Sequence, residues 1–80
     1  MEQPTKIMIE KKLQLVLEGK MTREEICEWA ADFIRNDESI LMNDISAWHY
    51  LIAISNIDEM IAPNKYLFSV NDIKNIMHQY

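Results

Sequence analysis

The chain has 80 residues, of which 49% are hydrophobic and 26% charged, and its net charge is −5. This size and composition exclude a disordered chain and leave room for only one hydrophobic core, so we expect residues 1–80 to form a single domain. One glycine and two prolines are too few for the turns of an all-β protein, which favours helices. There is one cysteine, no secretory signal and no apolar run near the roughly 20 residues of a membrane span, so we expect a cytoplasmic protein that does not enter membranes.

A first helix is predicted over residues 4–18. Apolar residues such as Ile9 and Leu13 recur there at helical spacing, and Gly19 is placed to end the helix in a left-handed conformation. A tight connection to the next element follows from this glycine.

A second helix is predicted from Arg23 to about Arg35. Thr22 and Glu25 have the spacing of a capping box, in which each side chain accepts a hydrogen bond from the other residue's backbone. Asn36 is expected to end the helix, because asparagine tolerates the left-handed conformation. The apolar stripe of this helix consists of Ile26, Trp29, Ala30 and Phe33.

A third helix is predicted over residues 44–56, with Asp44 as its N-cap. It is apolar on nearly every side, which is typical of a buried central helix. Its expected buried residues are Ile45, Trp48, Tyr50, Leu51, Ile52 and Ile54. Ser46, His49, Ala53 and Asn56 share one side, so we expect His49 to be exposed.

A fourth helix is predicted over residues 70–79, because Ser69 and Asp72 repeat the capping-box spacing. Pro63 and Asn64 indicate a turn, and residues 66–68 are expected to be extended or irregular. The fold class is therefore all-α, a compact bundle of about four helices with the third helix central. Residues 37–43 are read as either a loop or a short turn, and a fifth short turn is expected in 37–43 or 57–62.

No catalytic, metal or cofactor site is predicted. A zinc site needs about four clustered ligands, whereas the chain offers Cys27, His49 and His78 at wide separations. A single glycine cannot build a phosphate-binding loop. We therefore expect no enzyme activity, no metal and no cofactor, with Cys27 buried or at the core boundary.

The charge distribution carries the functional hypothesis. Residues 1–23 hold five basic and three acidic residues, residues 24–59 one basic and nine acidic, and residues 60–80 two basic and one acidic, giving +2, −8 and +1. Because nucleic-acid binding needs basic residues, this balance predicts no nucleic-acid partner. It favours an acidic protein-interaction module that binds, and inhibits or neutralises, a basic protein partner. The alternative is a structural or regulatory subunit of a homo-oligomer that associates through surplus apolar surface such as Tyr66, Phe68 and Tyr80.

Glu24, Glu28 and Asp32 are the candidate partner-binding residues, together with Tyr66. The three carboxylates are spaced four residues apart and form one line on the second helix, where like charges repel. Tyr66 is placed in a loop before a helix, where an aromatic ring can be displayed. A solvated acidic face that aids solubility explains the same carboxylates without any partner.

The stretch GKMTREEICEWA, at residues 19–30, resembles small uncharacterised bacterial proteins, as do the later Tyr66-Leu67-Phe68 and Asp72-Ile73. This resemblance covers about half of the chain and implies no activity or site. Small size, acidic charge and helicity also resemble toxin-neutralising immunity proteins in general character, without a shared motif.

Overall fold

The computed structural model describes residues 3–39 and 44–80. In these residues it forms four α-helices, Lys6–Leu17 (α1), Arg23–Arg35 (α2), Ile45–Ile54 (α3) and Val70–Gln79 (α4). A short 3-10 helix, Asp37–Ser39, follows α2, and an antiparallel pair of strands, Met60–Ala62 (β1) and Lys65–Tyr66 (β2), connects α3 to α4. The prediction of a mostly α-helical bundle is confirmed.

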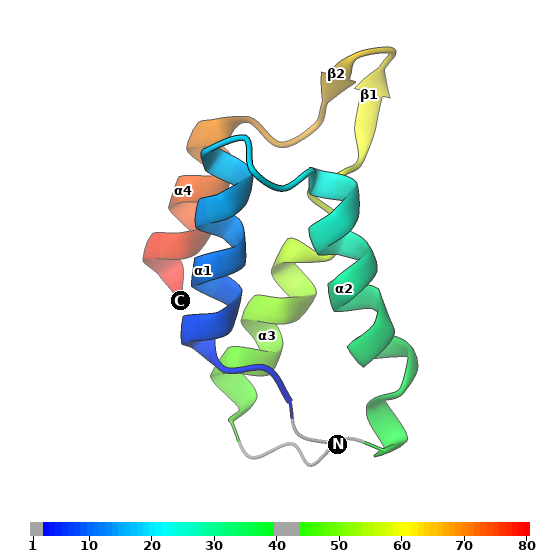
Figure 1. The fold of residues 1–80 in the computed structure, drawn as a ribbon, viewed down its shortest axis with the longest axis vertical. Helices are drawn as coiled ribbons and strands as arrows, with labels where there is room; N and C mark the ends of the chain where they lie inside the picture. The colour runs from blue at the N-terminus through cyan, green and yellow to red at the C-terminus, as the bar shows by residue number, and fades with distance from the viewer. Residues whose placement is uncertain (1–2, 40–43) are drawn as a thin grey trace.

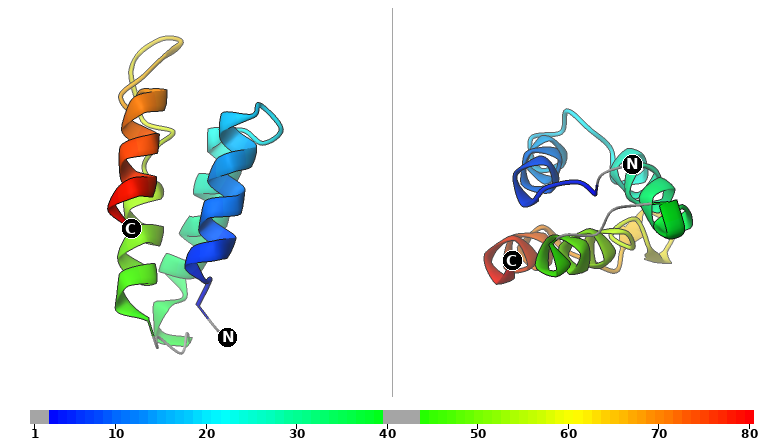
Figure 2. Two further views of the ribbon diagram at one scale, coloured as in Figure 1. Left: turned by 90° about the vertical axis from the view of Figure 1, so that its left-hand side faces the viewer. Right: turned by 90° about the horizontal axis from the view of Figure 1, so that it is seen from below.

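The four helices form two layers. Figure 1 shows that helices consecutive in the chain run in opposite directions, and Figure 2 shows α1 and α2 packed over α3 and α4. Helices α1 and α3 each contact all three other helices, and α3 buries more residues than any other described helix, as predicted for the central helix. In the end-on view of Figure 2, α2 and α4 lie at opposite corners of the bundle.

Each helix begins at a side chain that caps its backbone. The N-cap oxygens of Thr5, Thr22, Asp44 and Ser69 each accept a hydrogen bond from the backbone N–H three residues later. Both predicted capping boxes are present, at Thr22 with Glu25 and at Ser69 with Asp72. Because a cap satisfies backbone donors that the helix leaves unpaired, these local signals fix where the helices start.

The helix ends differ from the sequence predictions in three places, of which the simplest is that α3 ends at Ile54 rather than near Asn56. Helix α1 begins two residues after Pro4, because Gln3 exchanges hydrogen bonds of 2.8 and 2.9 Å with the backbone of Asp44 and Thr5 becomes the cap. Asn36 has a φ of −110° and is not left-handed; its side chain instead donates to the carbonyl of Asp32. The predicted left-handed glycine is confirmed, with a φ of +75° at Gly19.

The core is formed mainly by α3 and the apolar stripes of its neighbours. Its buried members include Ile9, Leu13, Ile26, Ala30, Trp48, Tyr50, Leu51, Ile54, Ile57 and Ile73. Two residues predicted to be buried are not, because α3 keeps one side open to solvent: Ile45 is 62% exposed and Ile52 is 43% exposed. His49 lies on this open side and is exposed, as predicted.

The β-hairpin was not predicted, although its turn was. Asn64 has a φ of +62° and follows Pro63, which is the turn that these two residues indicated. The strands are short and mostly exposed, so they lack the alternation that reveals a strand in a sequence. In the segment 57–62, for which a short turn was considered, a turn over residues 55–58 extends into the first two residues and strand β1 occupies the last three. The 3-10 helix occupies the start of 37–43, and residues 40–43 lie outside the described residues.

Tyr50 carries a buried hydroxyl that has no hydrogen-bond partner among the described residues. Burial, and to a smaller degree Glu10, raises the pKa of Tyr50 to about 12. Its ring stacks on Tyr80, with 5.3 Å between ring centroids, so the ring stabilises the core while the hydroxyl opposes it. No described helix is both long enough and apolar enough to cross a membrane.

We therefore predict that Tyr50→Phe raises the free energy of unfolding by about 1 kcal/mol, because a buried polar group without a partner costs about 1–3 kcal/mol. Urea denaturation measures the change. Leu51→Ala is the control at a neighbouring buried position and should lower the free energy by about 2–5 kcal/mol. A loss of stability in Tyr50→Phe would mean that the hydroxyl has a partner.

Candidate functional site

The acidic line on α2 is partly neutralised within the protein. Glu24, Glu28 and Asp32 are all exposed, as predicted. Arg35 donates to the carboxylate of Glu28 at 3.3 Å and also to that of Asp32. Both hydrogen bonds raise the pKa of Arg35, and the one to Asp32 has the larger effect. The repulsion expected between Glu28 and Asp32 is thus relieved by a shared cation.

Glu24 and Tyr66 contact each other. The Tyr66 hydroxyl donates to the Glu24 carboxylate at 2.8 Å, across 42 residues of sequence. Two hydrogen bonds lower the pKa of Glu24: the larger effect comes from its own backbone N–H and the smaller from the Tyr66 hydroxyl. All four residues predicted to bind a partner therefore have intramolecular partners, and their assignment to a binding site stays a prediction that these contacts do not test.

Arg23 joins α2 to the hairpin segment, a role that the sequence analysis missed. Its Nη1 atom donates to the carbonyl of Ile57 at 3.0 Å and to that of Phe68 at 2.6 Å. Its guanidinium also lies 4.1 Å from the centroid of the Tyr66 ring. One side chain thus holds both ends of the segment between α3 and α4, and the direction of α4 depends on it. We call this contact set the Arg23 clasp.

We predict that Arg23→Lys lowers the free energy of unfolding by about 1.5–3 kcal/mol, because a lysine lacks the planar guanidinium that lies over the Tyr66 ring while its Nη1 donates to two carbonyls. Urea denaturation is the measurement. Arg35→Lys is the matched control, because its ion pairs are exposed and its substitution should therefore cost less than that of Arg23. Equal effects of the two substitutions would contradict the assigned role of Arg23.

The basic residues divide into engaged and unengaged groups. Besides the two arginines, Lys12 lies 4.8 Å from the centroid of the Trp29 ring and Lys20 pairs with Glu18 at 3.2 Å. Within residues 3–39 and 44–80, the basic side chains with no such partner are Lys6, Lys11, Lys65 and Lys74. Three of these four are on α1 and α4. The positive charge available to a ligand is therefore concentrated on these two helices.

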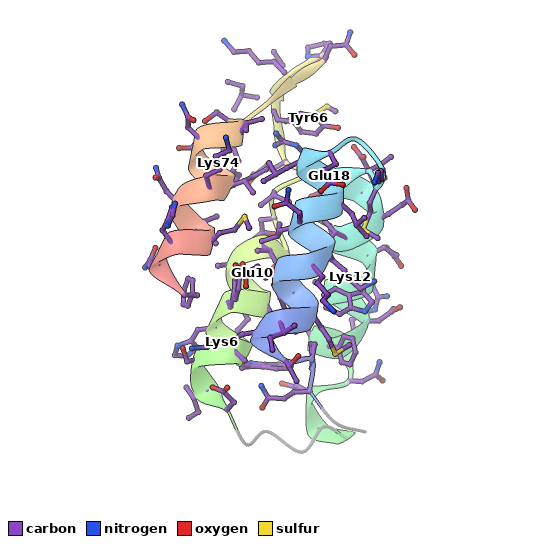
Figure 3. The ribbon with its side chains drawn as sticks, turned by 60° about the vertical axis from the view of Figure 1, so that its left-hand side comes forward. Lys6, Glu10, Lys12, Glu18, Tyr66 and Lys74 are labelled. Carbon is purple, nitrogen blue, oxygen red and sulfur yellow. The ribbon has the colours of Figure 1, made fainter. Side chains whose placement is uncertain are left out.

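A groove of about 180 Å³ runs between α1 and α4. It is lined by Glu10, Gln14 and Leu17 from α1 and by Lys74, Met77 and His78 from α4. In Figure 3, which brings this side forward, Lys6 on α1 and Lys74 on α4 lie on either side of Glu10 along the molecule. We call the outer surface of α1 and α4, with Lys6, Lys11 and Lys74, the α1–α4 face.

Helix α4 presents a polar stripe to solvent. Its exposed side chains include Asn71, Lys74, Asn75, His78 and Gln79, and none of these five makes a hydrogen bond or ion pair with another described residue. The one carboxylate of this helix, Asp72, accepts from the backbone N–H of Ser69 at 2.8 Å, and that capping contact lowers the pKa of Asp72. The stripe therefore offers amides and positive charge without an unengaged carboxylate.

The described residues contain no group of three or more metal-ligating side chains. Cys27 is buried, as predicted, and its thiol donates to the carbonyl of Ile54 at 3.5 Å. Burial raises the pKa of Cys27 to about 11, so the thiol is protonated and unreactive at neutral pH. These contacts give Cys27 a place in the core and assign it no chemistry.

Comparison with known proteins identifies the family. A family model described as "YxzC DNA-binding protein" matches residues 2–80. The protein "Uncharacterized protein YxzC" of Bacillus subtilis (strain 168) is 35% identical over 69 residues, which cover 86% of this chain and 56% of the relative. The chain thus spans about half the length of the curated relative that it matches. No solved structure matches the chain.

These findings correct the functional prediction. The family description contradicts the prediction of no nucleic-acid partner, and with it the acidic module that binds a basic protein partner. The homo-oligomer alternative gains no support either: Phe68 packs against the core and Tyr80 stacks on Tyr50, so neither is surplus apolar surface.

The prediction failed because it summed charge over long segments, whereas what an approaching ligand meets is the charge of one face. The resemblance to small uncharacterised bacterial proteins is confirmed, and the resemblance to immunity proteins is not shown. The chain belongs to the YxzC family.

Proposed function

We propose that the protein binds double-stranded DNA through the α1–α4 face. The observation that carries the proposal is the segregation of charge: unengaged lysines lie on α1 and α4, and the acidic line lies on α2, which is next to α1 and at the corner opposite α4 (Figure 2). The description of the family as DNA-binding supports the same reading.

The net charge of −5 does not oppose this orientation. The molecule measures 23 and 20 Å along its two shorter axes, whereas exposed charges at physiological salt are screened over about 8 Å. Helix α2 contacts α1 but is not among the elements that contact α4 in three or more residue pairs, so its acidic line is farther from the α4 side of the face than from the α1 side. Of the two acidic residues on or next to α1, Glu18 is engaged by Lys20 and Gln14, and Glu10 lies in the groove.

The proposal assigns phosphate contacts to Lys6, Lys11 and Lys74. Each lysine that neutralises a phosphate releases counterions, so the logarithm of the association constant falls with the logarithm of salt concentration by about 0.9 per contact. Three contacts give a slope of about −3 and roughly a 40-fold loss of affinity between 50 and 200 mM salt. This is a modest electrostatic contribution compared with that of strongly basic DNA-binding proteins.

We predict that wild-type protein binds a labelled duplex with this salt slope, and that Lys11→Gln combined with Lys74→Gln reduces the slope by about 2. Fluorescence anisotropy over a salt series is the measurement. Lys65→Gln removes an unengaged lysine from the hairpin, away from the α1–α4 face, and is the matched control that should leave the slope unchanged.

Absence of binding at low salt would overturn the proposal. So would a larger effect of Lys65→Gln than of the double variant, because the interface would then lie at the hairpin.

A further inference from the structure

We infer that α4 is the helix that enters the major groove, with Asn71 and Asn75 reading base edges. This inference rests on the proposed function and adds to it how sequence is recognised. The lysines of the α1–α4 face contact phosphates, which every duplex offers, so they position the protein without specifying a sequence. Recognition of bases needs side chains that match the donors and acceptors in the groove.

The polar stripe on α4 has the required chemistry. An asparagine amide carries both a donor and an acceptor and pairs with N6 and N7 of adenine in the major groove. Asn71, Asn75 and His78 are four and three residues apart, so they project from the same side of the helix. Lys74 flanks this line toward α1, where it lines the groove between the two helices.

The dimensions of α4 also fit. The major groove is about 12 Å wide, which admits a helix of about 10–12 Å diameter, and the 10 residues of α4 span about 15 Å along its axis. Figure 2 shows α4 at a corner of the bundle, with its outer side free of other elements of the chain. The stripe is therefore accessible to a duplex without any change in the fold.

The inner side of α4 holds the helix rigidly. Ile73 is 1% exposed, and Ile76, Met77 and Tyr80 pack against the core. Tyr80 adds a stack on Tyr50, and the Arg23 clasp fixes the segment that leads into the helix. Base readout requires side chains held on a rigid element, and this anchoring supplies it.

The other described helices do not offer this combination. Helix α2 exposes its acidic line, and α3 exposes Ile45 and Ile52. Helix α1 carries lysines, but it also carries the Glu10 carboxylate in the groove. Among the described helices, α4 alone combines amides and a cation with no unengaged carboxylate.

The test begins with selection of preferred duplexes from a random library by the wild-type protein. The enriched sequence should contain an adenine at the position that Asn71 or Asn75 contacts. At least one of Asn71→Ala and Asn75→Ala, namely the variant that removes the contacting amide, should lose roughly 5- to 150-fold of the preference for that adenine. The salt slope of both variants on random duplexes should equal that of wild type. The control is Asn56→Ala, which removes an exposed amide beyond α3 and should keep the full preference for the adenine.

A second measurement separates the two grooves. Replacing the contacted adenine by 7-deazaadenine removes only the N7 acceptor, which faces the major groove. This change should weaken binding by wild type and leave the corresponding asparagine variant unaffected. Thermal melting confirms that the variants are folded, which is expected because alanine favours helices.

The outcomes distinguish the inference from the proposed function. Salt-dependent DNA binding without an enriched sequence, or with full preference retained by both asparagine variants, would overturn the role of α4 and leave the proposed function intact. Insensitivity of wild type to 7-deazaadenine would do the same. Absence of any DNA binding by wild type would overturn both.

Discussion

The burial of α3 is the constraint on which the rest of the structure depends. This helix is apolar on most of its surface, and α1, α2 and α4 each cover part of it. Two helices cannot occupy the same side of α3, so α2 and α4 are held apart at opposite corners (Figure 2). The separation of the acidic helix from the amide-rich one is thus a consequence of core packing.

Intramolecular contacts then decide which charges face outward unpaired. Arg35 is engaged by Glu28 and Asp32, and Arg23 by carbonyls and the Tyr66 ring. Lys6 and Lys11 on α1 and Lys74 on α4 have no comparable partners among the described residues. A protein with a net negative charge thereby presents one face that suits a polyanion.

Much of the fold followed from local sequence signals, and the site did not. The bounds of α2 and α4 were predicted to the residue, because capping boxes at Thr22 and Ser69 are encoded within four residues. The Glu24–Tyr66 contact and the Arg23 clasp join residues 34 to 45 positions apart, and no local pattern encodes them. The placement of α2 and α4 at opposite corners of the bundle also depends on tertiary packing, which no local pattern encodes. The charges summed over segments of the sequence therefore suggested the wrong partner.

The most direct test of the account maps the DNA-facing surface by nuclear magnetic resonance. Backbone amide shifts are followed while a short duplex of about 12 base pairs is added to the labelled protein. The account predicts that the shifting amides belong to α4 and the outer side of α1, and that those of α2 around Glu28 and Asp32 stay in place. Shifts concentrated on α2, with α4 unaffected, would contradict it.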